Sequence, residues 1–381
     1  MKVFHCPSQI GGNPAVLAKH ERELGLDSIS ISEKSNYIGQ SSDSLLSGKN
    51  SGLLNLEVQR IKLIFNILTK ADIVHLNNGR FITPFFGAGV HPREEKFSSI
   101  LRFLIRMYAK LLQQFEMSVY RLNPKCIFLT FQGSDARETK CFIDKYQKNG
   151  LAESVVSRSG NSNQSIRRKK ILLSEIADKI YSLNPDLLEV LPKGAEFLPY
   201  ATESTLQAKV LPFINREEFV VGHAPTHRIV KGTNDVIDVV KKMRSKGHNV
   251  RLELIEGVSR QEAQSKFEGI DLFIDQLVIG WYGVVSLEVL AIGRPVICFL
   301  GGRGMRFVPK AMLNELPMIN ADSNTLENKI ISVMKMNHEE RIRLAERGIS
   351  YLKNWHDPRQ ITQRVVNDYK AVLSRRNMSC V

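Results

Sequence analysis

Residues 270–300 read IDLFIDQLVIGWYGVVSLEVLAIGRPVICFL: an apolar strand, a turn with two glycines, a helix and a second apolar strand. The strand segments are nearly continuous apolar runs, which is typical of parallel strands buried on both faces. Two parallel strands need a crossover between them, and the helix predicted over 285–293 supplies it. This unit therefore predicts an α/β protein built on parallel sheets.

The same alternation continues through the chain on both sides of this stretch. Strands are predicted over 218–225 and 250–257, with helices over 235–247 and 260–269. In the first half of the chain, the expected strands cover 2–6, 28–31, 72–77, 126–131, 179–184 and 195–200, and the expected helices cover 13–25, 58–71, 97–120 and 170–180. The last segments are helical, over 325–335, 338–355 and 357–373. Such repetition is typical of doubly wound sheets.

One segment breaks the alternation and divides the chain. Residues 198–217 contain prolines and follow no clear period, which indicates a linker. We therefore predict two doubly wound domains, 1–200 and 216–360, joined by a linker over 201–215. A last helix over 361–381 is expected to pack back on the first domain.

The composition excludes several classes of protein. Of the 381 residues, 43% are hydrophobic and 24% are charged, which fits neither a fibrous nor a disordered chain. The charge-free runs are shorter than the roughly 18 apolar residues of a membrane span, and the start, MKVFHCPSQIGG, lacks the apolar core of a signal peptide. The 5 cysteines are scattered, which argues against a disulfide framework or a zinc knuckle. We expect a cytoplasmic protein with reduced thiols.

The positive charge is concentrated in one segment. Residues 91–170 hold 16 basic and 7 acidic side chains, or +9 of the net +14. Within this segment Arg102, Arg106 and Lys110 share one face of a predicted amphipathic helix. Either its apolar face packs in the core and the basic stripe faces water, or the helix lies peripherally on an anionic membrane at its inner, cytoplasmic face. No nucleic acid is expected as a partner, because no nucleic-acid-binding motif accompanies the charge.

Several catalytic motifs are absent from the sequence. It contains no GxGxxG, Walker A, HExxH, GxSxG or CxxC pattern. It also lacks a DxD pair, which would hold a divalent ion against a diphosphate. We therefore expect no metal site and no cofactor.

The turn in the opening stretch has the chemistry of an anion site. Gly280 and Gly283 let a ligand approach the backbone, and the free amides of the helix beginning near Val284 suit a pyrophosphate. Glu288 lies about one and a half turns into that helix, where it could accept hydrogen bonds from a ribose. The alternative is a tight strand–helix turn with an ordinary helical carboxylate.

A second loop at the same sheet edge carries two cations. The segment HAPTHRIVKG, residues 223–232, follows a strand and places Arg228 and Lys231 before a helix, with Thr226 in the same loop. Two cations aimed at a diphosphate would stabilise the charge that develops on it as a leaving group. The alternative is a pair of solvated charges at a helix start.

Polar loop residues also follow three strands of the first domain. Gly12 and Asn13 lie in a glycine turn after the first strand. His75 and Asn77 come at the end of the strand DIVHLN, and Gln132, Ser134, Asp135 and Arg137 follow CIFLTF. Short polar side chains of this kind suit sugar hydroxyls, and we expect Asn13, His75, Asn77, Gln132 and Asp135 to bind an acceptor. His75 is equally well explained as a structural histidine.

Taken in order, the motifs resemble the retaining glycosyltransferases of family 4 (glycosyltransferase group 1), which have the GT-B fold. The resemblance covers essentially the whole chain. The segments that carry it are GGN (11–13), DIVHLN (72–77), LTFQGSDAR (129–137), IADKIYSLNPDLLEVLP (176–192), KG (231–232) and the block from Gly280 to GRPV (293–296).

This resemblance implies two Rossmann-like domains that face each other across a cleft, with a nucleoside-diphosphate sugar bound mainly by the second. It also implies metal-independent transfer with retention of configuration. Lys231 matches the family's diphosphate-binding lysine and Glu288 its ribose-binding glutamate. Gly12 matches the glycine of the first domain, and Gln132 stands where many relatives have histidine. The loop Glu256, Gly257 and Val258 would lie near the base.

The chain departs from the family pattern at three places. Gly280 stands where the first glutamate of the family touches the donor sugar. Trp281 and Tyr282 are bulky for that turn, and we expect them to shape the sugar pocket. Arg228 precedes Lys231 by three residues, a shorter spacing than the family's.

These observations predict a transferase that moves a sugar from a nucleoside diphosphate to a hydroxyl of a saccharide or lipid-linked saccharide, in surface polysaccharide or glycolipid assembly. Lys231, Arg228 and Glu288 are the expected catalytic residues. Gly12, Thr226, residues 256–258 and residues 280–284 are expected to bind the donor. Two alternatives stay open: a GT-B epimerase or hydrolase of sugar nucleotides, and a non-catalytic protein that binds sugars or a lipid surface.

Overall fold

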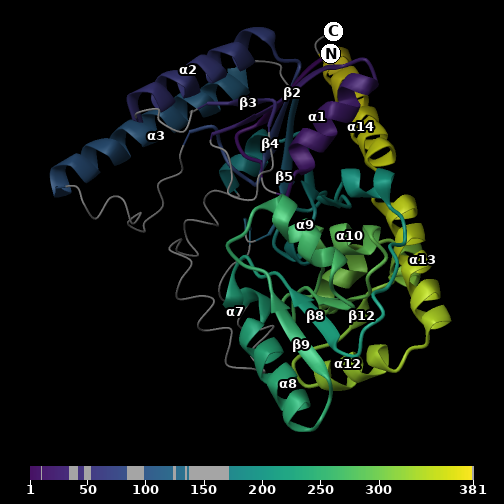
Figure 1. Cartoon of the computed structure of the whole chain (residues 1–381). Helices are drawn as coiled ribbons and strands as arrows, with labels where there is room; N and C mark the ends of the chain where they lie inside the picture. The colour runs from purple at the N-terminus through teal and green to yellow at the C-terminus, as the bar shows by residue number, and fades with distance from the viewer. Residues whose placement is uncertain are drawn as a thin grey trace. The chain divides into compact units, whose positions relative to one another are not determined.

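The computed structural model describes residues 1–9, 11–33, 42–46, 53–83, 98–122, 126–133, 135–136 and 171–379. Within them the chain divides into two compact units. Unit 1 comprises Met1–Leu198 and Arg359–Val381, and unit 2 comprises Pro199–Pro358. Each unit contains one parallel sheet (Figure 1).

Unit 1 is built on a sheet of seven parallel strands in the order β3-β2-β1-β4-β5-β6-β7. The strands are β1 (Lys2–Cys6), β2 (Asp27–Ser32), β3 (Ser44–Leu45), β4 (Ile73–Asn77), β5 (Cys126–Phe131), β6 (Lys179–Ser182) and β7 (Glu196–Phe197). The sheet is accompanied by helices α1 (Asn13–Glu23), α2 (Leu53–Lys70), α3 (Ser99–Leu122) and α14 (Pro358–Ser379), and by a 3₁₀ turn, η3 (Pro185–Glu189). Strand β1 pairs with β2 on one side and with β4 on the other. The strand order therefore reverses between β1 and β4.

The last helix, α14, packs against the sheet of unit 1. The Tyr369 hydroxyl lies 2.6 Å from Nδ1 of His75 on β4, and its ring meets the Phe128 ring edge-on at 4.5 Å. Nearer the end of the helix, Arg376 forms an ion pair with Asp178 at 2.7 Å. Since α14 follows unit 2 in sequence, these contacts tie the end of the chain to the first sheet.

Unit 2 has a five-stranded parallel sheet in the order β12-β11-β10-β8-β9. The strands are β8 (Phe219–His223), β9 (Val250–Leu254), β10 (Leu272–Ile274), β11 (Val296–Cys298) and β12 (Ile319–Asn320). The helices are α7 (Arg228–Lys231), α8 (Thr233–Ser245), α9 (Arg260–Glu268), α10 (Val284–Ala291), α11 (Lys310–Glu315), α12 (Leu326–Met334) and α13 (His338–Trp355), with 3₁₀ turns η4 (Glu203–Gln207) and η5 (Arg303–Phe307). Here the order reverses between β8 and β10.

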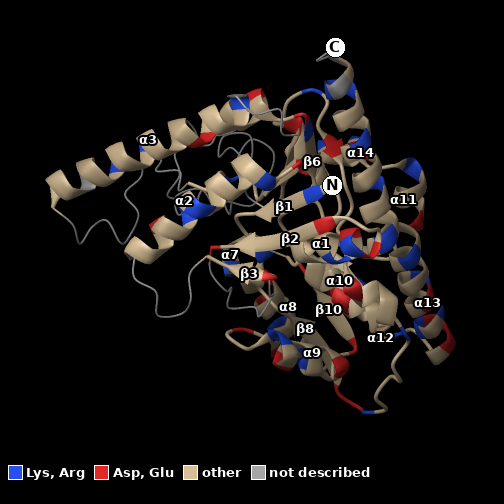
Figure 2. Ribbon diagram, turned by 90° about the horizontal axis from the view of Figure 1, so that it is seen from above, with Lys and Arg blue, Asp and Glu red and all other residues tan. Residues whose placement is uncertain are grey.

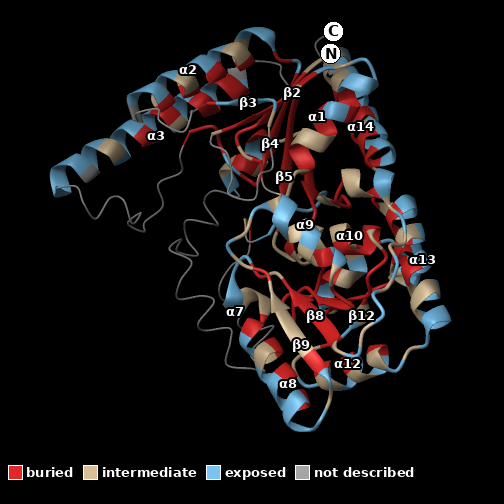
Figure 3. Cartoon of the chain, in the orientation of Figure 1, coloured by how far each residue is buried: buried red, intermediate tan, exposed pale blue. Residues whose placement is uncertain are grey.

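Apolar side chains on both faces of this sheet are buried, as the sequence pattern predicts. One face packs against α8 and α12, where Val236, Val240 and Ile330 are at most 3% exposed. On the other face, Phe267 of α9 meets Phe273 of β10 at 5.5 Å between ring centroids. Figure 3 shows β8 as buried, the edge strand β9 as intermediate and the outer turns of the helices as exposed. Because helices cover both faces of the sheet, its polar surface lies in the loops at the ends of the strands.

The segment that we predicted as a linker, 201–215, packs into unit 2. The amides of Lys209 and Leu211 donate to the carbonyls of Ala291 and Ile292, at 2.9 and 3.1 Å. The sequence of this segment has no hydrophobic period because the segment is largely irregular. Backbone hydrogen bonds nevertheless hold it against unit 2.

Replacement of Tyr369 by Phe tests the attachment of α14. The change leaves Nδ1 of the buried His75 without its hydroxyl partner, which costs about 1–3 kcal/mol of unfolding free energy. Urea unfolding followed by tryptophan fluorescence and circular dichroism measures this loss. Tyr108→Phe is the control, since its exposed hydroxyl meets Glu57 and its loss should cost less than about 0.5 kcal/mol. Equal effects of the two changes would contradict the anchoring role of Tyr369.

Candidate active site

The candidate site lies at the carboxyl edge of the unit 2 sheet, where the strand order reverses. Ligands of doubly wound sheets bind at such a reversal, beyond the ends of the strands. The loop after β8 leads into α7, and the loop after β10 leads into α10. Lys231 comes from the first loop and Gly283 from the second, as the sequence predicted. The fold brings them together: a Cβ placed on Gly283 would lie 3.5 Å from the Lys231 ammonium.

A buried carboxylate, Asp275, joins the two loops. It lies just after β10, with a side chain only 2% exposed, and forms an ion pair with Lys231, which is 14% exposed. Its Oδ2 atom accepts hydrogen bonds from the amide of Gly283, at 2.6 Å, and the hydroxyl of Ser286, at 2.8 Å. Asp275 thus fixes the start of α10 and holds the lysine beside it.

The charge state of Asp275 follows from these contacts. Burial by itself would raise the pKa of this carboxyl, but the charge of Lys231 and the hydrogen bonds from Lys231, Gly283 and Ser286 outweigh it. The pKa therefore lies below its ordinary value of 3.8. The carboxylate is ionised at neutral pH, so it holds the ammonium of Lys231 in one position.

The start of α10 retains part of its expected capacity for an anion. We predicted free amides from Gly283 onward, but the Gly283 amide already donates to Asp275. The amide of Ser286 donates to the carbonyl of Gly283. Among the described residues, no group accepts a hydrogen bond from the amides of Val284 and Val285. The Lys231 ammonium carries three N–H donors. Among the described residues, its acceptor is the carboxylate of Asp275.

Arg228 and Glu256, both predicted as site residues, contact each other. The guanidinium Nε donates to Oε1 of Glu256 at 2.8 Å, and an Nη completes a two-pronged pair. Hydrogen bonding to Arg228 lowers the pKa of Glu256. The arginine is 53% exposed, so water screens the pair and Arg228 can exchange partners. Thr226 is exposed before it, and Gly257 and Val258 continue the loop after β9.

Glu288 is held inside unit 2 by an arginine that the sequence analysis did not identify. Its Oε1 accepts from Nη2 of Arg260, at the start of α9, at 2.6 Å. Burial raises the pKa of Glu288, and the charge of Arg260 opposes that rise. Glu288 is 9% exposed. A ribose hydroxyl would therefore meet a carboxylate that is already positioned by Arg260.

The expectation for Trp281 and Tyr282 is corrected by their burial. Both side chains are 0% exposed, and their rings stack at 4.4 Å. The Tyr282 hydroxyl lies 2.6 Å from that of Tyr351 and 2.9 Å from Nε2 of His356. The aromatic pair therefore belongs to the core between α10 and α13 and does not line a sugar pocket.

Gly280 is a glycine because the neighbouring loop leaves no room for a side chain. A Cβ at this position would lie 2.1 Å from the carbonyl oxygen of Gly301, in the loop after β11. The Gly301 amide also donates to the Gly280 carbonyl at 3.3 Å. The glutamate that the resemblance places here could not be accommodated without moving the backbone.

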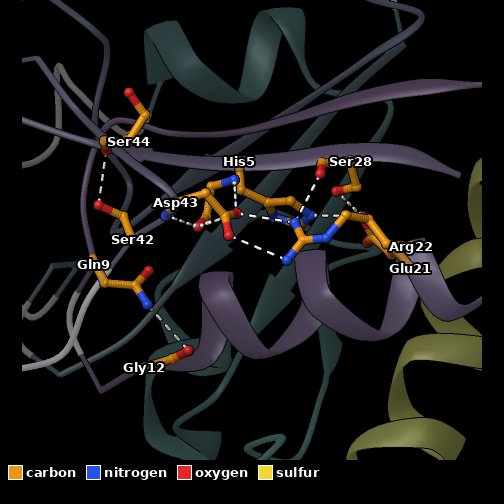
Figure 4. A network of polar contacts seen from close by, with 10 residues as sticks. His5, Gln9, Gly12, Glu21, Arg22, Ser28, Ser42, Asp43 and Ser44 are labelled. Carbon is orange, nitrogen blue, oxygen red and sulfur yellow. Dashed lines mark hydrogen bonds and ion pairs between the residues drawn. The ribbon is translucent and has the colours of Figure 1, made fainter.

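The reversal point of unit 1 is also lined by polar loops, and the loop after β4 includes the exposed Arg80. The Ser8 hydroxyl, after β1, donates to Oδ1 of Asn78, after β4, at 2.6 Å. Gly12 adopts a left-handed φ of 77° before α1, and its carbonyl accepts from Gln9. Asn13 begins the helix and is buried. Figure 4 shows this turn beside a buried network in which Glu21 of α1 contacts His5 and Ser28.

His75 is a structural histidine, which corrects its expected role in acceptor binding. It is fully buried, with Nδ1 at 2.6 Å from Tyr369 and Nε2 at 2.7 Å from Thr130. Burial, with the nearby His5, holds its pKa well below the ordinary value of 6.5. Asn77 is also buried and donates to the His75 carbonyl. Its Oδ1 has no hydrogen-bond partner within the described segments.

The loop after β5 brings Gln132 and Asp135 together. The Gln132 amide donates to Asp135 Oδ2 at 3.1 Å, and the Gly133 amide donates to Oδ1 of Asn184, after β6, at 2.7 Å. Ser134 and Arg137, which the sequence also pointed to, lie outside the described residues.

Three residues of unit 2 were missed by sequence reasoning: Asp275, Ser286 and Arg260. Asp275 carried a usable signal, since it is an acidic residue at the end of an apolar strand. Arg260 and Glu288 are 28 residues apart, and no local pattern links them. Within the described residues, no group of three or more histidine, cysteine or acidic side chains is arranged to hold a metal ion.

Substitution of Gly280 tests the close packing of the two loops. Gly280→Ala should lower the unfolding free energy by about 2 kcal/mol or more, because the new methyl group overlaps the Gly301 carbonyl. Gly280→Glu should be worse. Gly269→Ala is the control, since its Cβ would have 3.5 Å to the nearest atom. Thermal unfolding compares the three. A stable, soluble Gly280→Glu protein would contradict the packing described here.

Substitution of Asp275 by Asn tests the buried ion pair. A lowered pKa in the folded state means that Asp275 stabilises the fold above pH 3.8 and that this contribution is lost at lower pH. We expect the variant to lose roughly 3 kcal/mol at pH 7. The difference in unfolding free energy between the variant and the parent protein should become smaller as the pH falls below 3.8. Urea unfolding at stepped pH measures it, and a difference independent of pH would argue against an ionised Asp275.

Comparison with known proteins identifies the fold. No family model matches the sequence, and no curated protein matches it either. The chain is similar in structure to a sucrose-phosphate synthase from Thermosynechococcus elongatus (TM-score 0.58, 13% identity, 98% of this chain and 99% of that one). It is also similar to a glycosyltransferase from Rickettsia africae (TM-score 0.57, 12% identity, 98% of each chain).

A third similar structure is an alpha-glucosyltransferase in complex with UDP and a 13-mer DNA containing an A:G mismatch (TM-score 0.55, 11% identity, 97% of this chain and 99% of that one). At such identities the likeness concerns the fold. With its two parallel sheets and terminal helix, the chain has the GT-B fold.

Proposed function

We propose that the protein is a glycosyltransferase that moves a sugar from a nucleoside-diphosphate sugar to an acceptor hydroxyl. One observation carries the proposal: the partly buried Lys231 ammonium lies beside Gly283, where α10 begins with two amides that no described residue engages. An ammonium next to a helix start is suited to a diphosphate. The described likeness to glycosyltransferases of the same fold, one of them a complex with UDP, supports this choice of ligand.

The electrostatics of the site suit a leaving group that gains negative charge. As the bond between the sugar and the diphosphate breaks, charge accumulates on the phosphate oxygens. Asp275 engages one donor of the Lys231 ammonium, so two donors remain for those oxygens. The amides of Val284 and Val285 add fixed dipoles that need no rearrangement during the reaction. Lys231 and these amides act on the departing diphosphate.

The other predicted residues take supporting roles in this proposal. Glu288, oriented by Arg260, accepts from the ribose. Arg228 exchanges its contact with Glu256 for a contact with the phosphates. The loop from Glu256 to Val258 borders the base of the nucleotide. Asn13, Asn77, Gln132 and Asp135 in unit 1 present neutral amides and one carboxylate to the sugar hydroxyls of the acceptor.

The proposal extends to retention of configuration and to a reaction without a divalent cation. Lys231 and the α10 amides supply the positive charge that a metal ion would otherwise provide. The acceptor is a saccharide or lipid-linked saccharide of surface polysaccharide or glycolipid assembly. Turnover should persist in EDTA, and the product anomer can be read by NMR.

Release of nucleoside diphosphate from a panel of nucleotide sugars, with and without acceptors, tests the reaction class. Release that depends on an acceptor supports the transferase. Release without acceptor would assign a hydrolase, and conversion of the donor sugar would assign an epimerase. Nucleotide-sugar binding without any turnover would assign a binding protein, the alternative that the missing glutamate at Gly280 favours.

Replacement of Lys231 by Ala should lower kcat at least 100-fold, or about 3 kcal/mol of transition-state stabilisation. This variant also leaves Asp275 buried without its partner, so the double change Lys231→Ala/Asp275→Asn is the matched control for folding. Steady-state kinetics and thermal unfolding are measured for both. The double variant should be more stable than the single one and equally inactive. Recovery of turnover in the double variant would show that Lys231 acts only by neutralising Asp275.

A further inference from the structure

Helices α2 and α3 of unit 1 carry an exposed apolar surface that the proposed reaction does not use. On α3, Ile100, Leu104, Met107 and Leu111 are between 45% and 72% exposed. Their spacing of four, three and four residues places them on one face of the helix. Figure 3 shows the start of α3 as mostly exposed, whereas most of the buried residues of the helix lie in its second half.

The second half of α3 already supplies the face that packs in the core. There Glu116, Val119 and Tyr120 are at most 5% exposed. The Glu116 carboxylate accepts from the amides of Ile82 and Thr83, each at 2.8 Å. The core therefore needs only this end of the helix, and of the two alternatives that the sequence left open, packing of the apolar face in the core describes this end.

Helix α2 extends the same surface. Leu54, Val58 and Phe65 are between 47% and 85% exposed. The two helices are in contact, with the Phe65 and Phe115 rings 6.1 Å apart and the Tyr108 hydroxyl 3.2 Å from Glu57. In Figures 1 and 2 they lie side by side, with the start of α3 extending past α2. We call Leu54, Val58, Phe65, Ile100, Leu104, Met107 and Leu111 the α2–α3 apolar surface.

Cations accompany this surface. Arg106 and Lys110 on α3, and Lys62 on α2, are exposed. Residues 98–115 contain no acidic side chain. The side chain of Arg102 lies outside the described residues, although its position in the sequence adds a charge to the same stretch.

The charge selects the occupant of the surface. A second copy of this chain would bring the same patch to a two-fold axis and place like cations near one another. An anionic lipid surface has the complementary charge, and it offers acyl chains to the apolar residues while lysine and arginine extend to the headgroups. None of the described helices is long and apolar enough to cross a membrane.

We propose that the α2–α3 apolar surface binds peripherally to an anionic membrane, with α3 lying in the plane of the headgroups. Ile100, Leu104, Met107 and Leu111 enter the boundary between headgroups and acyl chains. Arg106, Lys110 and Lys62 pair with lipid phosphates. This surface is built from unit 1 residues alone and does not depend on the proposed chemistry of unit 2.

Flotation with vesicles tests the proposal on the full-length chain. The probes are vesicles of phosphatidylcholine alone and vesicles with 30–40% phosphatidylglycerol, roughly the anionic range in which basic helices bind. The protein should float only with the anionic vesicles, and less at high salt. Leu104→Gln/Met107→Gln/Leu111→Gln should abolish flotation. Arg106→Gln/Lys110→Gln should weaken it roughly 20-fold at low salt.

Matched controls come from unit 2. Ile214→Gln removes an exposed apolar side chain, and Lys310→Gln/Lys329→Gln removes two exposed cations. Both controls should float like the parent protein, and circular dichroism with thermal unfolding should show that every variant is folded. No flotation of the parent chain, or equal losses in surface and control variants, would overturn the proposal. Self-association in sedimentation velocity that the triple variant abolishes, without lipid binding, would assign the surface to a second copy.

Discussion

The ion pair between Lys231 and Asp275 connects the two loops on which the candidate site depends. It spans the point where the strand order of unit 2 reverses, and the same carboxylate binds Gly283 and Ser286 at the start of α10. A carboxylate as deeply buried as Asp275 is stable only when its remaining hydrogen bonds are made, and here the Gly283 amide and the Ser286 hydroxyl make them. Asp275 therefore fixes the position of Lys231 and the start of α10 together, including the amides of Val284 and Val285.

A second constraint explains how the chain departs from the family that it resembles. Gly280 packs against the Gly301 carbonyl, and Tyr282 is held in the core by Tyr351 and His356. The turn is therefore closed to a carboxylate at 280 and to aromatic contacts with a ligand. In the proposed reaction, contacts with a donor sugar therefore come from other groups.

Much of the fold could be predicted from the sequence, because apolar runs and helical periodicity are local signals. The strand over 126–131 and the helix over 338–355 are found at the predicted residues. The short elements β3, α7, α11 and β12 were not predicted, since two to six residues carry too little pattern. The partners of the site residues were not predicted either. Glu288 meets Arg260, and His75 meets Tyr369 from a helix 294 residues away, because the fold and not the local sequence brings them together.

At their reversal points the two sheets carry different side-chain contacts, an ion pair in unit 2 and a neutral hydrogen bond in unit 1. Unit 2 places Lys231 and Asp275 there, whereas unit 1 places Ser8 and Asn78. The most direct measurement is a crystal structure of the full chain with a bound nucleoside diphosphate. Our account predicts phosphate oxygens within hydrogen-bond distance of the Lys231 ammonium and of the Val284 or Val285 amide. A nucleotide bound elsewhere, with Lys231 and those amides facing only water and Asp275, would contradict it.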